Sequence, residues 1–353
     1  MSKTKGNVMD PLDLVHTYGA DAVRFTLAAL ASPGRDLPLD ARRMEGYRAF
    51  ATKLWNAARF VQMNLAGDEG ELESLDTAAL ALPERWILAE LTETVGAVRE
   101  ALDSFRFDEA CRSLYQFVWN DFCDWYVELA KPVLTGTSQV RSPQVVRTVA
   151  RGVLLSVLKL LHPIMPFITE EIASHLGFSG MLITAAYPRP QEAWQFARER
   201  ELFRTVQGVV QAVRSYRHLV GLPPNSPLSV ILEEPEPAVA QAFSELREEV
   251  MRLASLSALE AGGPVPASAV RDAVGFLRFA IVLPEGALGP EERQRLGKEL
   301  TAAQEELSRV KARLADPGFT SRAPAEVVEQ TRARERELTH RLELLAKTLG
   351  EGA

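Results

Sequence analysis

Apolar side chains recur along most of this chain at the spacing that is typical of helices with one buried face. The clearest early stripe lies between about Arg42 and Leu65 and alternates gaps of four and three residues: Tyr47, Ala51, Leu54, Ala58, Val61 and Leu65. Such a stripe predicts a helix that packs one side against its neighbours. Similar patterns predict further helices, which cover about 83–95, 107–130, 145–161 and 169–176.

The loops between these runs are short, so residues 41–190 are expected to form an antiparallel helical bundle. Lys131-Pro132 is expected to end the third helix at about residue 130, because proline lacks the N–H that would continue it. Ahead of the bundle, Asp10 and Pro11 mark a helix start. Residues 1–40 are therefore expected to form a loop and a short connector.

Residues 191–286 have a mixed pattern that predicts a small α/β module. Pro223 and Pro224 break a preceding helix, and a second helix is expected at about 237–253. Two segments rich in Val, Ile and Phe predict strands on either side of that helix, at 226–232 and 276–283.

Residues 287–353 carry the most regular pattern. Two apolar stripes flank Asp316-Pro317-Gly318, namely Leu296, Leu300, Ala303, Leu307, Val310 and Leu314, then Val328, Thr331, Glu335, Leu338, Leu342, Leu345 and Leu349. Both stripes step by three and four residues, which predicts an antiparallel coiled-coil hairpin. Thr331 and Glu335 make its far part poorer in apolar packing, so the tip is expected to be its more mobile end. The predicted fold class is mostly α: a bundle, a small α/β module and this hairpin.

The composition is that of an ordinary globular protein with two or three domains: 353 residues, 46% hydrophobic and 25% charged. No stretch is long and apolar enough to predict a membrane span or an export signal, so a cytoplasmic location is expected. Cys111 and Cys123 form no metal or disulfide pattern and are expected to be small core side chains. The five histidines lack metal-ligand spacing, so no metal site is expected.

The formal net charge of −7 argues against broad, sequence-blind coating of nucleic acid. An acidic chain can still bind RNA if its cations are concentrated on one surface. The N-terminus offers one such concentration, because Lys3 and Lys5 alternate with Ser2 and Thr4 ahead of Gly6. Mobile cations, hydroxyls and a glycine suit a polyphosphate. A frayed, solvated tail is the alternative for this short segment.

These N-terminal residues resemble the signature loop of class I aminoacyl-tRNA synthetases, which ordinarily reads Lys-Met-Ser-Lys-Ser and continues Lys-Gly-Asn. The chain starts at the loop's Met, so its first Lys is missing, and Thr4 stands for the last Ser. Further runs resemble the same family: Tyr18–Arg24, Ala31–Asp36, Gly46–Phe50, Lys53–Phe60, Trp119–Tyr126, Leu161–Ile172 and Phe319–Val328. One departure is Ala173, where the family usually has Trp.

The chain is most similar to the valyl-tRNA synthetase family, because the isoleucine and leucine enzymes differ around Pro33-Gly34-Arg35-Asp36. The resemblance implies the C-terminal portion, from the signature loop onward. The nucleotide-binding sheet and the editing domain would precede residue 1, so the chain alone is expected to be inactive. A fragment, a misassigned start and a free-standing relative all remain open.

The resemblance also implies partners and site residues. The complete enzyme would attach valine to its tRNA with ATP and Mg²⁺, and Lys3, Ser2 and Thr4 would contact ATP. The partner would be the tRNA for valine rather than DNA or a membrane, bound by a monomer. Candidate tRNA-binding residues lie on the first bundle helix and on the hairpin: Arg48, Lys53, Trp55, Asn56, Arg59 and Phe60, then Arg313, Arg322 and Arg334.

These residue types suit RNA, since aromatic rings stack on unpaired bases and Arg or Asn reads base edges. Lys53, Asn56 and Arg59 share roughly one helix face. The alternative is a solvated face with aromatic core neighbours, and salt-bridged solvent faces on the hairpin. Asp121 and Asp124 are interpreted as hydrogen-bonding groups of a helix face. Two other functions stay open: a stand-alone, non-catalytic tRNA-binding protein and a coiled-coil interaction protein.

Overall fold

The computed structural model describes residues 10–31, 40–67, 69–284 and 286–350, without the side chains of residues 321, 322 and 325. It is mostly helical with one small sheet, so the predicted fold class is confirmed. The chain divides into two compact units, Met1–Glu201 and Leu202–Ala353. The finer division at residues 40, 190 and 286 stays a prediction. No helix within the described ranges is long and apolar enough to cross a membrane.

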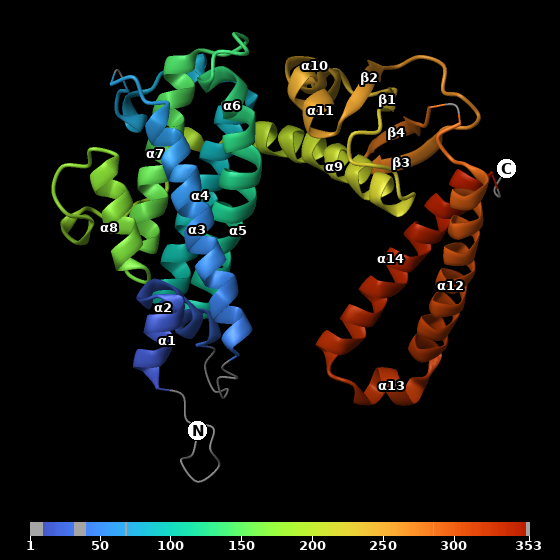
Figure 1. Cartoon of the computed structure of the whole chain (residues 1–353), viewed down its shortest axis with the longest axis horizontal. Coiled ribbons are helices and arrows are strands. Elements are labelled where there is room, and N and C mark those ends of the chain that lie inside the picture. The colour runs from blue at the N-terminus through green and yellow to red at the C-terminus, as the bar shows by residue number, and fades with distance from the viewer. Residues whose placement is uncertain (1–9, 32–39, 68, 285, 351–353) are drawn as a thin grey trace. The chain divides into compact units, whose positions relative to one another are not determined.

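The first unit is a bundle whose long helices run side by side (Figure 1). Its helices are α1 (Pro11–Tyr18), α2 (Ala20–Leu30), α3 (Ala41–Met63), α4 (Leu82–Asp103), α5 (Phe107–Gln116), the π-helix η4 (Phe117–Tyr126), α6 (Val127–Leu134), α7 (Pro143–Leu161) and α8 (Pro166–His175). Short 3₁₀ turns lie in the loops: η2 (Leu72–Ser74), η3 (Thr77–Ala79), η5 (Leu182–Thr184) and η6 (Glu192–Trp194).

Helix α3 begins where the sequence predicted, because Asp40 caps it by accepting a 2.9 Å hydrogen bond from the Arg42 N–H. Its predicted stripe is buried at three positions and half-buried at the other three. The buried face is wider than that stripe, since Phe50 and Ala57 also lie in the core.

The predicted end of the third helix at residue 130 is wrong. The chain continues as α5, η4 and α6 to Leu134, with Pro132 inside the last helix. Ala130 and Val133 pack against Val146 of α7, and this burial holds the final turn in place. The carbonyl of Pro132 then accepts two backbone N–H groups, from Thr137 at 2.8 Å and Ser138 at 2.9 Å. Proline therefore costs one hydrogen bond near the helix end without stopping it.

The second unit contains the predicted α/β module. Its strands are β1 (Leu228–Glu233), β2 (Leu256–Ala261), β3 (Val270–Val274) and β4 (Leu277–Val282), in the order β2-β1-β4-β3. The pair β1–β2 is parallel and joined through α10 (Pro237–Glu245) and α11 (Arg247–Leu253); the other pairs are antiparallel. Helix α9 (Ala197–Leu219) begins in the first unit and continues in the second. The sequence did not predict the edge strands β2 and β3: β2 has no β-branched residue, and β3 is five residues long with Arg271 and Asp272 at its centre.

The hairpin consists of α12 (Pro290–Ala315) and α14 (Ala325–Leu349), which pack antiparallel. Leu296, Leu300, Leu338 and Leu345 of the predicted seam are buried. Leu307, Val310 and Leu314 are only half-buried, and the two ribbons separate toward the tip in Figure 1. The predicted turn contains a short helix, α13 (Pro317–Arg322), which Asp316 caps by accepting the Gly318 N–H at 2.8 Å.

Candidate RNA-binding surface

Helix α3 presents three surfaces outside the core, because successive residues of an α-helix are rotated by about 100°. An exposed ridge carries Arg48, Asn56 and Arg59. Lys53 and Phe60 lie on one side of this ridge, toward η4 and α6. Trp55 lies on the other side, toward α8. The structure therefore distributes the six predicted α3 residues over a ridge and two flanks rather than one face.

The flank toward η4 is organised around the Lys53 ammonium. Its Nζ lies 2.5 Å from Asp124 Oδ1 and 3.7 Å from the centroid of the Trp119 ring. In an α-helix, residues five apart would point about 140° away from each other. In the π-helix η4, hydrogen bonds join residues five apart, as from the Val127 N–H to the Phe122 carbonyl, so Trp119 and Asp124 share one side. The π-helix η4 thus brings the Trp119 ring and the Asp124 carboxylate into contact with the same Lys53 ammonium.

A row of half-buried aromatic rings extends from this cation along α5. Trp119 stacks on Tyr115 with centroids 5.5 Å apart and planes at 11°, and Tyr115 meets the edge of Tyr47 at 6.0 Å. A groove of about 540 Å³ opens beside the rings of Tyr47 and Tyr115, with Arg43 and Arg112 on its walls. Sequence analysis did not assign these rings or arginines to a site. The four-residue spacing of Tyr115 and Trp119 was the available signal, since it places both rings on one helix face.

Phe60 and Arg59 lie near the end of α3, whereas Arg48 lies closer to its start. Lys131 Nζ lies 5.8 Å from the Phe60 ring centroid, a cation–π contact that sequence analysis missed. Arg48 donates a 3.3 Å hydrogen bond to the Thr17 carbonyl near the start of α3. Arg48 and Arg59 are separated by about 16 Å along the axis at 1.5 Å per residue, so they do not meet on one nucleotide.

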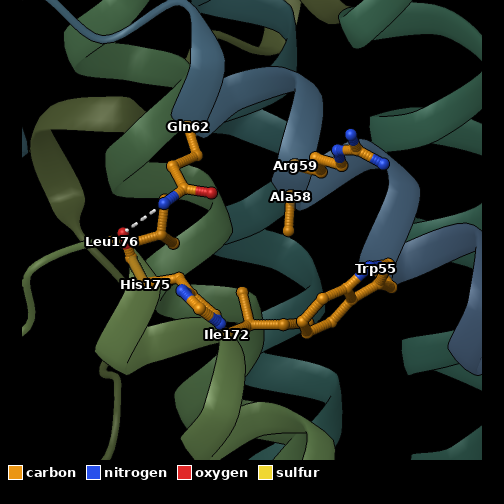
Figure 2. A pocket seen from close by; sticks show the side chains of 7 residues that line it. All are labelled: Trp55, Ala58, Arg59, Gln62, Ile172, His175 and Leu176. Atoms are coloured by element: carbon orange, nitrogen blue, oxygen red, sulfur yellow. Dashed lines mark hydrogen bonds between the residues drawn. The ribbon is translucent and has the colours of Figure 1, made fainter.

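The flank toward α8 holds a pocket of about 150 Å³ (Figure 2). The Trp55 ring meets the His175 ring edge-on at a centroid distance of 5.7 Å. Three buried apolar side chains form its floor: Ala58 of α3, Ile172 of α8 and Leu176, which follows α8. Gln62 joins the two helices through a 2.9 Å hydrogen bond from its Nε2 to the His175 carbonyl. Only Trp55 and Arg59 of this pocket were expected from the sequence.

The hairpin arginines differ in their contacts: Arg334 forms ion pairs, and Arg313 lies over an aromatic ring. Arg334 donates to Glu306 of the opposite helix at 2.8 Å and to Glu337 of its own at 2.9 Å. The hydrogen bond to Glu306 raises the pKa of Arg334 above its usual value. The Arg313 guanidinium lies 4.3 Å from the Phe319 ring centroid and is exposed. Arg334 therefore clamps the hairpin, whereas Arg313 lies at its surface.

Some predicted residues lie outside the described part of the chain. These are Ser2, Lys3 and Thr4 of the N-terminal segment, and the side chain of Arg322. Within the described ranges, no group of three or more His, Cys, Asp or Glu side chains is placed to hold a metal ion.

Both cysteines are buried, and desolvation raises the pKa of each thiol to about 12. We expect the native chain to react with a thiol reagent at pH 8 at least about 100-fold more slowly than free cysteine, because the thiolate is the reactive form. Absorbance with a disulfide reagent measures the rate, and the same chain in denaturant is the control. One thiol reacting at the rate of free cysteine would contradict this placement.

Comparison with known proteins identifies three matched regions. Residues 1–40 match a model of class I tRNA synthetases (I, L, M and V), residues 84–232 the anticodon-binding domain of tRNA ligase, and residues 290–351 the valyl tRNA synthetase tRNA binding arm. Helix α3 lies between the first two ranges.

The similar proteins include valine–tRNA ligases of several bacteria. That of Caulobacter vibrioides is 39% identical over 95% of this chain and 37% of its own length. Those of Geobacter sulfurreducens and Geobacillus kaustophilus are 38% and 37% identical over 99% of this chain and 40% of their own length. Among solved structures, a ternary complex of Agrobacterium radiobacter K84 LeuRS is 20% identical over 55% of this chain and 22% of that chain, at a TM-score of 0.44.

The chain thus spans about two fifths of the length of these relatives, in the region that ends with the tRNA binding arm. The expected resemblance is confirmed by all three matched regions and by relatives that cover nearly the whole chain. The chain belongs to the valyl-tRNA synthetase family and corresponds to the C-terminal, tRNA-binding part of its members.

Proposed function

We propose that this chain holds the tRNA for valine while a valine–tRNA ligase attaches the amino acid with ATP. The observation that carries the proposal is the α3 flank, where Lys53 lies over Trp119 and Lys131 lies by Phe60. Each ammonium also pairs with one carboxylate, of Asp124 and of Glu128, and its three donors leave room for a phosphate beside that carboxylate. Cations beside half-exposed rings suit an unpaired RNA loop, because phosphates pair with the cations and bases stack on the rings. The family membership supports tRNA as the RNA.

Two further parts of the proposal rest on the family alone. Lys3, Ser2 and Thr4 would contact ATP, with Mg²⁺ as its usual companion. A cation there would stabilise charge that develops on the phosphates as pyrophosphate leaves. We further propose that the chain acts in the cytoplasm, as a monomer that binds one tRNA.

Substitution of the α3 flank tests the proposal. We expect Lys53→Met and Phe60→Ala each to weaken binding of a valine tRNA transcript about tenfold, from lost phosphate pairing and lost base stacking. Fluorescence anisotropy at low and moderate salt measures the affinity. Lys159→Met is the matched control, since Lys159 Nζ also lies over a ring, that of Phe178 at 5.4 Å, but on α7. We expect it to change affinity less than about twofold.

A chain that binds no tRNA at either salt concentration would contradict the proposal and favour the coiled-coil interaction protein. Binding that is equally weak in Lys53→Met and Lys159→Met would show that general charge, not this flank, holds the RNA.

The hairpin offers a separate prediction. We expect Arg313→Gln to weaken tRNA binding and to make its dependence on salt shallower by about one released counterion, because its exposed guanidinium is available to a phosphate. Arg334→Gln instead removes a cross-helix clamp and should loosen the hairpin. Binding across a salt series, with amide hydrogen exchange of 290–349, separates the two. Equal effects of both substitutions on the salt slope would contradict the assignment.

A further inference from the structure

The pocket between α3 and α8 has features that the proposed contact surface toward η4 does not explain. It is small and has an apolar floor, with two aromatic rings meeting at its wall. Its volume of about 150 Å³ matches a cavity in another protein that takes up one benzene molecule. One six-membered ring therefore fits, whereas a fused two-ring purine is too large to enter fully.

The amide of Gln62 presents a hydrogen-bond acceptor, rather than a donor, to this pocket. Its Nε2 must be the atom that donates to the His175 carbonyl at 2.9 Å, since a carbonyl accepts only. The Oε1 atom is thereby turned toward Ala58, across the pocket, as Figure 2 shows. A ring that enters with an exocyclic amino group can donate to this oxygen. A ring that offers a carbonyl at the same place meets a second acceptor instead.

Arg59 supplies a charge at the edge of the pocket. Its aliphatic stem lines the wall, and its guanidinium points outward, away from Gln62 (Figure 2). It is exposed and has no hydrogen bond or ion pair within the described part of the chain. An outward guanidinium beside a pocket suits the phosphate of a nucleotide whose base has entered.

We propose that this pocket takes up one cytosine of an unpaired RNA loop. The ring lies against Trp55 and His175, the N4 amino group donates to Gln62 Oε1, and the adjoining phosphate meets Arg59. Among the pyrimidines, uracil presents an acceptor where cytosine presents the amino group, so Gln62 distinguishes the two. This inference rests on the proposed RNA binding of the first unit and adds one contact that selects a base.

The test uses the full chain and stem-loop RNAs that differ in one base. One RNA has an all-uridine loop, and the others carry a single cytosine at each loop position in turn. We expect one of these cytosine loops to bind about fivefold more tightly than the uridine loop, the gain of a single hydrogen bond. Gln62→Met, which keeps the side-chain length but removes the acceptor, should abolish that preference. Gln62 is exposed, so the variant is expected to fold.

Gln241→Met is the matched control, because Gln241 is an exposed helical glutamine of the second unit. It should keep the full preference. Equal affinity of the wild-type chain for all loops, or a preference that survives Gln62→Met, would overturn the cytosine pocket while leaving RNA binding intact. Failure of every loop and of the tRNA to bind would contradict the proposed function itself.

Discussion

Replacing Arg141 with methionine is expected to destabilise the first unit by about 3–5 kcal/mol, because the change leaves a carboxylate buried without its cation. Arg141 Nη1 lies 2.5 Å from Glu84 Oε1, and the two side chains are 5% and 1% exposed. The second guanidinium nitrogen donates to the Leu129 carbonyl, and the Tyr126 hydroxyl donates to Glu84 at 3.4 Å. The pair therefore ties α4 to the start of α6 and to the loop before α7.

Urea unfolding followed by tryptophan fluorescence measures this effect cleanly. All five tryptophans lie in the first unit, so the signal does not report on the second. Arg106→Met is the control, since Arg106 forms ion pairs with Glu100 and Glu109 at the surface and should cost less than about 1 kcal/mol. The double variant Glu84→Leu/Arg141→Met should recover most of the loss, because no unpaired charge remains.

The penalty should also depend on pH. Burial already raises the pKa of Glu84 above 4.5, and removing Arg141 removes the group that most opposes this rise. A carboxyl with a raised pKa in the folded state favours folding in its protonated form, and this contribution is lost as pH rises. The difference between Arg141→Met and the wild type should therefore shrink as pH falls from neutral toward 4.5. A pH-independent difference below about 1 kcal/mol would contradict the buried pair.

Two helical glycines of the first unit should respond to alanine with opposite signs. At Gly152 of α7, an added Cβ would lie 2.6 Å from Leu72 Cβ and 2.8 Å from its Cδ2, so η2 must shift. We expect Gly152→Ala to cost about 1–3 kcal/mol through overpacking. At Gly46 of α3, nothing lies within 4 Å of the added Cβ. Gly46→Ala should stabilise by about 0.5–1 kcal/mol, because alanine loses less backbone freedom in a helix.

The same fluorescence-detected unfolding compares both variants with the wild type. A thermal melt followed by circular dichroism confirms that each keeps its helical content. If Gly152→Ala left the free energy of unfolding unchanged or raised it, the close contact between α7 and η2 would be wrong, and if Gly46→Ala lowered it, the open space beside α3 would be wrong.

The helices could be predicted because each buries one face. A buried helix face requires apolar residues at regular steps of three and four, and this spacing is visible in the sequence. Leu54, Ala58 and Val61 show this for α3. The π-helix could not be predicted, since Val118, Phe122 and Trp125 step by four and three residues, as the buried face of an ordinary α-helix does. Proline at 132 was misleading because the packing of Ala130 and Val133, which local sequence does not show, outweighs one lost hydrogen bond.

The candidate site was predictable only where one helix carries it. Lys53, Trp55, Arg59 and Phe60 were found from α3 alone. Their partners come from segments far along the chain: Trp119 and Asp124 from η4, and His175 from α8. Such neighbours depend on how the helices pack, and spacing within a single helix does not contain that information.

The wide helix η4 also restricts how this part of the chain can vary in length. Deleting one residue of η4 outside the interval from Trp119 to Asp124 would rewind the segment toward ordinary α-geometry and leave these two residues five apart, about 140° around the axis. Either the indole or the carboxylate would then turn away from Lys53. Side chains here can be exchanged one at a time, but a change of length outside that interval would separate the ring from the carboxylate even if every residue type were kept.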